Sequence, residues 1–353
     1  MDFEDRLAER PVFVTGADGF VGSHLVDLLV ECDADVHAFV RATSSGELKN
    51  IRGHGEAITL HRGDLRDKHS VERALRALEG HDDAIVFHLA AQAHVGESWE
   101  RPYETVDTNV VGTLNLLQSI VDLDLDIYKF DTAGTSEEYG NVEDQRKDHH
   151  EFGDDGRVIL SERSPVNPTS VYATSKLAAD FLTMNYHDAY GVPGVTTRMF
   201  NNYGPRQNPR YITGTIITQA LEREIVELGN LQPKRDMCYV ADGVRGHLHV
   251  ALEGDPGEQY VYGYGENISM REWANTILEV GSEEGYWDAP QIVQDEDRFR
   301  PGDSDVEELL VGYEKLHDET GWEPRVDWRE GVARTIEWYA ANKELWYGRV
   351  DWR

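Results

Sequence analysis

The chain has 353 residues, of which 66 are acidic, 34 are Lys or Arg and 40% are hydrophobic, and its formal net charge at pH 7 is −32. The length and the apolar fraction suit one large α/β domain or such a domain with a smaller lobe. The negative charge repels phosphate backbones and argues against nucleic-acid binding, and no apolar run approaches the roughly 18 residues of a membrane span.

The acidic residues are spread along the whole chain rather than gathered in a tail. We therefore expect adaptation to high salt, where screening removes the self-repulsion, and loss of structure or activity in dilute buffer. Cys32 and Cys238 are too few for a disulfide framework, and residues 1–5 lack the basic and apolar parts of a signal sequence. The expected compartment is the cytoplasm.

The first predicted element is a buried strand at residues 11–15, followed by a glycine-rich turn and a helix at 23–30. Gly16, Gly19 and Gly22 lie in the turn, which lets the backbone approach a pyrophosphate at the helix N-terminus. A glycine triplet alone is also typical of an ordinary tight turn. In this strand, turn and helix context it indicates a dinucleotide site.

Further strands are expected downstream, and helical patterns separate them. This alternation predicts an α/β fold with a doubly wound parallel sheet, whose ligands bind beyond the carboxyl ends of the strands. The expected strands are residues 35–40, 58–62, 84–91, 127–132 and 195–200.

Two long helices are predicted beside this sheet. One carries an apolar stripe from Pro102 to Val121, and the other contains Tyr172 and continues through Tyr186. Each stripe either packs on the sheet or meets its symmetry mate in a homodimer. The segment 141–168 is polar and long for a loop, and we assign no metal site to its histidine pair or elsewhere in the chain.

Tyr172 and Lys176 are four residues apart and lie on one face of the predicted helix. A neighbouring ammonium is expected to lower the pKa of the tyrosine and to make it a usable base near neutral pH. The spacing alone is also typical of an amphipathic helix surface. Together with the glycine turn it indicates a hydride-transfer centre.

Several short motifs accompany these two and occur in a fixed order. Together they resemble the extended short-chain dehydrogenase/reductases that act on nucleotide sugars, and are most similar to the 4,6-dehydratases of the GDP-mannose and N-acetylhexosamine branches. The motifs are residues 16–22, 63–65, 89–92, 135–137, 172–176, 198–205, 228–231, 235–236, 300–304 and 320–324.

The resemblance implies a Rossmann domain at residues 1–202 and about 236–252, with a smaller nucleotide-sugar lobe at 203–235 and about 253–353. It also implies a nicotinamide cofactor. The cofactor-binding residues would be Gly16, Gly19, Phe20, Val21 and Gly22 at the pyrophosphate, Asp64 and Leu65 at the adenine, and Leu89, Ala90, Ala91, Tyr172 and Lys176 toward the nicotinamide ribose.

Arg41 decides our expectation about the cofactor. NAD enzymes of this type place a carboxylate after the second strand for the ribose hydroxyls, and this strand ends instead in Arg41 and hydroxyl residues. A guanidinium there favours the 2′-phosphate of NADP, with NAD as the alternative.

The resemblance further implies a chemistry for the catalytic residues Thr135, Ser136, Glu137, Tyr172 and Lys176. Tyr172 takes the O4 proton of the sugar beside Thr135, and Glu137 takes the C5 proton before water leaves from C6. The product is a 4-keto-6-deoxy sugar. Substrate-binding roles fall to Asn201, Arg235 and Arg300.

Two departures from the family pattern stand out. Ser136 occupies a position where the dTDP-glucose type carries Asp, which leaves the acid for the departing hydroxyl open, and Gly134 replaces a usual Ser. The alternatives are a 4-epimerase, a UDP-glucuronate decarboxylase and, more remotely, a non-catalytic NADP-binding module. The expected partners are a nucleotide sugar and a second copy of the chain, in a homodimer or homotetramer, without nucleic acid or membrane.

Overall fold

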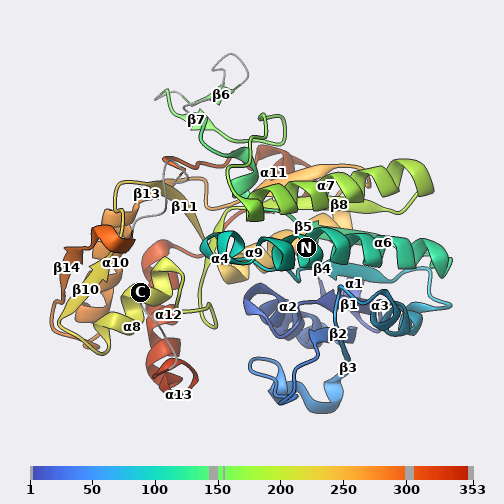
Figure 1. Ribbon diagram of the computed structural model, residues 1–353, viewed down its shortest axis with the longest axis horizontal. Coiled ribbons are helices and arrows are strands. Elements are labelled where there is room, and N and C mark those ends of the chain that lie inside the picture. The colour runs from blue at the N-terminus through green and yellow to red at the C-terminus, as the bar shows by residue number, and fades with distance from the viewer. Residues whose placement is uncertain (1–2, 143–149, 154–155, 299–305, 349–353) are drawn as a thin grey trace.

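A computed structural model describes residues 3–142, 150–153, 156–298 and 306–348. Its centre is a seven-stranded parallel sheet in the order β12-β8-β5-β4-β1-β2-β3 (Figure 1). The strands expected from the sequence are all present within it. The strands of the sheet are β1 Pro11–Thr15, β2 Asp35–Arg41, β3 Ile58–Gly63, β4 Ile85–His88, β5 Lys129–Ala133, β8 Gly194–Met199 and β12 Gln259–Tyr262.

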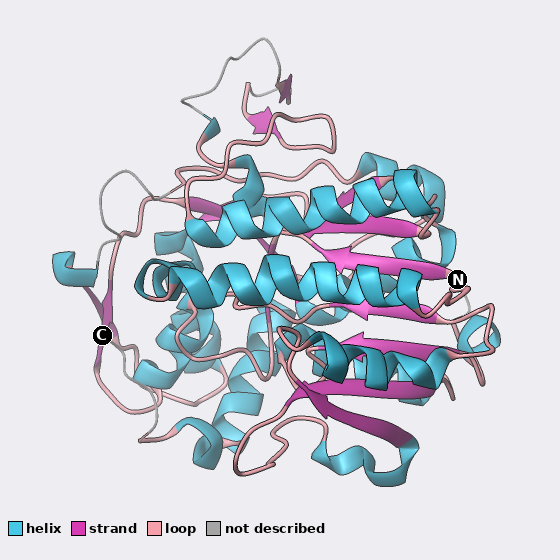
Figure 2. Cartoon of the chain, turned by 45° about the vertical axis from the view of Figure 1, so that its right-hand side comes forward, coloured by secondary structure: helices cyan, strands magenta, loops and turns pink. Residues whose placement is uncertain are grey.

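Helices cover both faces of the sheet, in front of the strands and behind them in the view of Figure 2. Phe13 of β1 packs in a core with α3 (Lys68–Leu75), α6 (Gly112–Asp122) and α7 (Val171–Tyr190). Its neighbours Val12 and Val14 point to the other face, where α2 (Phe20–Glu31) and α9 (Val240–Glu253) lie. The predicted doubly wound fold is confirmed.

The helix expected from Pro102 to Val121 is present with one irregularity. It consists of α5 (Pro102–Val106), a π-helical segment η3 (Asp107–Val111) and α6, without a break in the chain direction. Isolated π-helical turns are frequent at functional sites because the extra residue in the turn re-aims a side chain. Here the buried residue of that segment is Asn109.

A smaller lobe lies beside the carboxyl edge of the sheet, at the left in Figure 1. One strand differs from the expected division. Residues 259–262 are expected in the lobe, but they form β12, which pairs with β8 in the main sheet and buries Tyr260, Val261 and Tyr262. The lobe contains β9 Asn201–Tyr203, β10 Ile225–Leu228, β11 Lys234–Tyr239, β13 Asn267–Ser269, β14 Gln291–Gln294, α8 Ile212–Ala220, α10 Met270–Glu283, α12 Trp328–Ala341 and α13 Lys343–Trp346.

The largest hydrophobic core runs through both parts of the molecule. It joins Val26 of α2 and Leu248 of α9 to Trp273 of α10 and Tyr339 of α12. The lobe therefore packs on the sheet domain through a common interior.

The remaining elements are short, and they include a hairpin in the segment expected to be a long loop. Within the described residues no helix has the length and apolar character needed to cross a membrane, and both cysteines are buried thiols. These elements are α1 Glu4–Leu7, η1 Arg52–Ala57, η2 Arg76–Leu78, α4 Val95–Glu100, η4 Ser136–Tyr139, β6 Glu151–Phe152, β7 Val158–Ile159, η7 Glu296–Arg298 and α11 Glu314–Thr320.

Candidate active site

The predicted site residues gather where β1, β4 and β5 end. These three strands are neighbours in the sheet and run parallel, so the segments that follow them emerge at one edge. Gly16 follows β1, residues 89–91 follow β4, and residues 135–137 follow β5. This edge, at the reversal of strand order, is where ligands bind in open α/β sheets.

The glycine turn requires its glycines for geometric reasons. Gly16 has a φ of 68°, and a Cβ there would lie 2.9 Å from the Cα of Ala90. A Cβ on Gly22 would lie 2.2 Å from the carbonyl oxygen of Gly16, and one on Gly19 would lie 2.9 Å from the same oxygen. The turn thus leaves backbone N–H groups at the start of α2 without intervening side chains, as a pyrophosphate site needs. Phe20 and Val21 form the first turn of that helix.

Asp18 anchors this turn to the segment after β2. Its carboxylate accepts backbone N–H groups from Lys49, Asn50 and Ile51 at 2.8–3.1 Å. Sequence reasoning missed this role, since the segment lies about thirty residues downstream and only the fold brings it close. The contact holds the loop that follows Arg41 against the edge of the sheet where β1, β4 and β5 end. We call it the cofactor edge, because the sequence analysis expects the dinucleotide there.

A buried histidine supports the end of β4. One ring nitrogen of His88 lies 2.9 Å from the hydroxyl of Thr15, and the other lies 2.9 Å from that of Thr113. Thr15 also accepts the N–H of Ala90 at 3.1 Å. Burial, followed by the nearby charge of Lys176, lowers the pKa of His88 to about 3. His88 is therefore neutral at physiological pH, and its ring bridges Thr15 at the end of β1 and Thr113 of α6 by hydrogen bonds.

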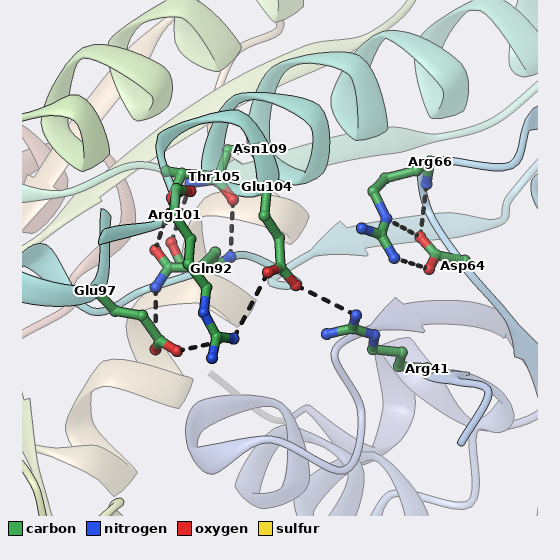
Figure 3. Close-up of polar contacts among 9 residues, drawn as sticks. All are labelled: Arg41, Asp64, Arg66, Gln92, Glu97, Arg101, Glu104, Thr105 and Asn109. Carbon is green, nitrogen blue, oxygen red and sulfur yellow. Dashed lines mark hydrogen bonds and ion pairs between the residues drawn. The ribbon is translucent and has the colours of Figure 1, made fainter. Parts of the chain in front are cut away.

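Asn109 of the π-helical segment fixes the loop after β4 (Figure 3). Its side chain accepts the N–H of Gln92 at 2.8 Å and donates to the Gln92 carbonyl at 3.1 Å. The same amide donates to the hydroxyl of Ser175 on α7 at 2.9 Å. One buried amide thus ties the loop after Ala91 to the helix that carries Tyr172 and Lys176.

Thr135, Glu137 and Tyr172 come together as predicted. Thr135 and Glu137 are both 8% exposed, Thr135 hydrogen-bonds Tyr172, and the charge of Glu137 acts on the Tyr172 hydroxyl. The expected lowering of the Tyr172 pKa by Lys176 stays a prediction, because other groups have the larger effects on this pKa. Burial raises the pKa of Tyr172, nearby Tyr211 raises it further, and the bond from Thr135 only partly offsets these effects.

Lys176 is almost completely enclosed. Burial lowers its pKa, while the carboxyl groups of Asp180, Glu138 and Asp131 act in the opposite direction. Asp131 in turn contacts His247 at 2.6 Å and Thr197 at 2.5 Å. The cation therefore sits in front of a layer of buried acids that the sequence motifs did not indicate.

Arg41 and Asp64 lie at the outer end of the cofactor edge, each in an ion pair (Figure 3). Arg41 at the end of β2 contacts Glu104 of α5 at 3.3 Å, and Arg101 reaches the same carboxylate at 3.7 Å. Asp64 is held by Arg66 at 2.6 Å, and this hydrogen bond lowers the pKa of Asp64. Neighbouring Leu65 is buried, and its carbonyl accepts a bond from α6.

The substrate residues are only partly placed. Asn201 on β9 pairs in register with Met237 of β11, two positions beyond Arg235, so Asn201 and Arg235 lie on one face of that small sheet. Arg235 is buried and donates to the carbonyl of Lys234. Arg300 lies outside the described residues. No cluster of three or more potential metal ligands occurs in the part of the chain that the structure describes.

Tyr211 is a site residue that sequence reasoning missed. It lies close enough to raise the pKa of Tyr172, and it donates to the carbonyl of Ala93 at 3.1 Å. Its ring packs against that of His94. No local signal in its sequence neighbourhood points to the site, since it reaches there from the lobe.

Comparison with known proteins matches residues 13–335 to a family model described as GDP-mannose 4,6 dehydratase. A dTDP-glucose 4,6-dehydratase from Streptomyces antibioticus is 33% identical, over 95% of this chain and 94% of that protein. Among solved structures, the dTDP-glucose 4,6-dehydratase DesIV from Streptomyces venezuelae, with NAD bound, matches with a TM-score of 0.82, 29% identity and coverage of 96% and 99%. A UDP-glucose 4-epimerase from Thermus thermophilus, also with NAD, matches with a TM-score of 0.78 and 29% identity, over 94% of this chain and 99% of that chain.

Proposed function

The chain belongs to the GDP-mannose 4,6 dehydratase family, and from that premise we propose that it removes water from a nucleotide hexose to give the 4-keto-6-deoxy sugar. The observation that carries the proposal is the meeting of Thr135, Glu137 and Tyr172 at the end of β5. A similar fold serves an epimerase, so the overall fold does not decide the reaction. The carboxylate of Glu137 beside Tyr172 supports dehydration, because it can serve as the base at C5.

The residues at the strand ends fit a nicotinamide dinucleotide. A Cβ on any of the three turn glycines would collide with the backbone of Gly16 or Ala90, so only glycines allow this tight turn at the start of α2, where the pyrophosphate would lie. Leu89, Ala90 and Ala91 continue this edge toward Lys176. When bound, the nicotinamide takes a hydride from C4 of the sugar and later returns it to C6.

The protein's own groups handle the protons. Tyr172 must first lose its own proton, a change that the hydrogen bond from Thr135 favours. As the phenolate it accepts the O4 proton while C4 loses its hydride, and Thr135 bonds O4 beside it. The resulting ketone acidifies C5, and Glu137 removes the C5 proton. The C6–O bond then breaks, and the hydroxyl leaves as water with a proton from Ser136 or from water. Return of hydride to C6 and of the proton from Glu137 to C5 gives the product, and the proton that Tyr172 took from O4 replaces the one that left with the water.

Substitution of the C5 base tests this assignment. Glu137→Gln should abolish loss of water from a panel of nucleotide sugars, followed by mass spectrometry, while cofactor binding is kept. Reduced nicotinamide should accumulate in the variant, because C4 oxidation proceeds and the hydride has no acceptor. Glu272→Gln, on the surface of the lobe, serves as the control.

The panel also separates the alternatives. Loss of carbon dioxide would identify a decarboxylase, and an altered sugar of unchanged mass would identify an epimerase. Undiminished dehydration by Glu137→Gln would rule out the role of this carboxylate. Binding of cofactor without conversion of any sugar would favour the non-catalytic module.

For the cofactor we propose NADP, with NAD as the alternative. The support is Arg41, whose guanidinium is 65% exposed at the end of β2, where a 2′-phosphate would lie. Glu104 pairs with it now and would have to yield to the phosphate. Solved relatives bind NAD, so direct titration with both cofactors decides the choice.

We also propose a homodimer through α5, η3, α6 and α7. Large apolar side chains stand exposed along these helices, and an isologous contact would bury them. They are Tyr103, Val106, Val111, Leu114 and Phe181. Light scattering should give twice the chain mass, or four times for a tetramer, and Phe181→Glu should yield monomers; a monomeric wild type would contradict the proposal.

Finally, we propose that the chain works in the cytoplasm of a cell with a high internal salt concentration. The support is its net charge of −32, which salt screens over about 3 Å at 1 M. The melting temperature should rise between dilute buffer and molar KCl. A melting temperature independent of salt would contradict adaptation to salt.

A further inference from the structure

Glu138 follows the proposed C5 base and points the other way, into the protein. Its side chain is completely buried, and its Oε1 accepts the backbone N–H of Thr135 at 2.9 Å. The hydroxyl of Thr135 in turn accepts the N–H of Glu137 at 3.3 Å. The two contacts form a capping box that closes the turn carrying both proposed catalytic groups.

The other carboxylate oxygen of Glu138 pairs with Arg198, which is equally buried and also pairs with Asp180. Oε2 of Glu138 lies 2.7 Å from Nε of Arg198, and Asp180 approaches the same nitrogen at 3.0 Å. Arg198 is 3% exposed and also donates to the hydroxyl of Tyr139 at 3.4 Å. Two carboxyl groups thus face one guanidinium directly behind Lys176.

Gly134 provides the space for this arrangement. A Cβ at position 134 would lie 2.9 Å from Oε1 of Glu138, 3.0 Å from Cγ of Arg198 and 3.1 Å from Oδ1 of Asp180. A side chain at 134 and the carboxyl group of Glu138 therefore compete for one volume. The departure of Gly134 from the family pattern and the buried Glu138 are two parts of one feature.

We propose that Glu138 is a positioning residue, which holds Thr135 and Glu137 in the geometry that proton transfer at C4 and C5 requires. The inference rests on the proposed function. Burial, and then the charge of Asp180, raise the pKa of Glu138 well above its usual range. The charges of Arg198 and Lys176 oppose this shift.

Two substitutions at this position test the proposal. Glu138→Ala removes the acceptor of the Thr135 N–H, and kcat should fall about 10- to 100-fold with little change in KM, since small misplacements of reacting groups have effects of that size. Glu138→Gln keeps an acceptor for Thr135 and a donor toward Asp180, and it should restore most of the activity. A purely structural side chain would change the melting temperature and leave kcat of the folded enzyme unchanged.

A matched control exists in the same chain. Glu272 closes a capping box with Ser269 at the start of α10, at an exposed position in the lobe. Glu272→Ala should leave kcat unchanged. Gly134→Ala should reduce kcat when Glu138 is present and have little effect in the Glu138→Ala background, because the two side chains then no longer compete.

Amide hydrogen exchange gives a readout that does not need activity. Exchange over residues 134–140 should rise at least tenfold in Glu138→Ala and stay at the wild-type level in Glu138→Gln. If the wild type converts no nucleotide sugar, the proposed function fails and exchange alone judges the positioning role. Wild-type exchange in Glu138→Ala, or kcat within threefold of an active wild type, would overturn the inference.

Discussion

Two groups of ion pairs border the cofactor edge, and they differ in burial. The inner group, Glu138, Asp180 and Arg198, is sealed behind Lys176 with at most 3% of any side chain exposed. The outer group, Arg41, Glu104 and Arg101, lies at the outer end of this edge, where the two arginine side chains are 60–65% exposed. Both groups pair carboxylates with arginines, but the inner group has two acids and one arginine, whereas the outer group has two arginines and one acid, and the surroundings are opposite.

Burial decides what each group contributes. Charges removed from water are costly unless they are paired, so the inner group tolerates only one arrangement and fixes the turn at Thr135. Exposed pairs contribute little to stability and are screened by salt, so the outer group can exchange partners when a charged ligand arrives. The inner charges therefore serve geometry, and the outer charges serve recognition.

The largest expected effect comes from breaking the inner group. Arg198→Met leaves the two carboxyl groups facing each other in the interior, and the free energy of unfolding should fall by about 3–5 kcal/mol. Arg101→Met, in the outer group, should lower it by at most about 1 kcal/mol. Urea unfolding measures both, and equal losses would remove the distinction between the two groups.

A second test compares a fully buried acid, Asp236, with a partly exposed one, Asp64. Burial raises the pKa of Asp236 in the lobe from 3.8 to about 7, whereas the hydrogen bond from Arg66 lowers the pKa of the partly buried Asp64. The folded chain binds the Asp236 proton more tightly than the unfolded chain, so this group lowers the free energy of unfolding as pH rises from 3.8 to 7. The decrease is on the order of 4 kcal/mol.

Asp236→Asn should remove that dependence. The variant keeps only one of the two oxygens that accept the N–H groups of Tyr264 and Gly265, so it starts less stable, but it should gain on the wild type as pH rises from about 4 to 7. The measurement is the difference between the two unfolding free energies at each pH. A difference independent of pH would show that Asp236 is ionised throughout.

The smallest effect concerns the outer group and depends on the proposed choice of NADP. Arg41→Ala should weaken NADP binding about tenfold, or about 1.4 kcal/mol, and NAD binding much less. Glu104→Gln should strengthen NADP binding a few-fold, because it frees the guanidinium. Calorimetric titration at two salt concentrations checks both, and equal losses for the two cofactors would count against a 2′-phosphate at Arg41.

Much of the fold was predictable because its signals are local. The strands at 11–15 and 35–40, the glycine turn and the helix of Tyr172 each depend on patterns within a few residues, and the structure confirms them. The place of β12 was not predictable in the same way. A short apolar strand after α9 fits either sheet, and only tertiary packing assigns it to β8.

The residues of the site also divide into those that local motifs predict and those that only tertiary contacts reveal. Thr135, Glu137 and Tyr172 follow from motifs, whereas Glu138 reads as an exposed carboxylate in a polar turn until its partners are known. Its partners Asp180 and Arg198 come from α7 and β8, far along the chain. The same holds for Asn109, whose direction depends on a π-helical turn that no periodicity indicates.

The common interior of sheet domain and lobe has a consequence for how the molecule moves. Since one core joins α2 and α9 to α10 and α12, the two parts share the packing that a hinge would have to break. Their separation would expose large aromatic side chains, so calorimetry should record one cooperative transition for both. Access to the carboxyl edge of the sheet then depends on the side chains and loops around it, and changes of substrate in evolution are expected there while the packing of sheet domain and lobe stays rigid.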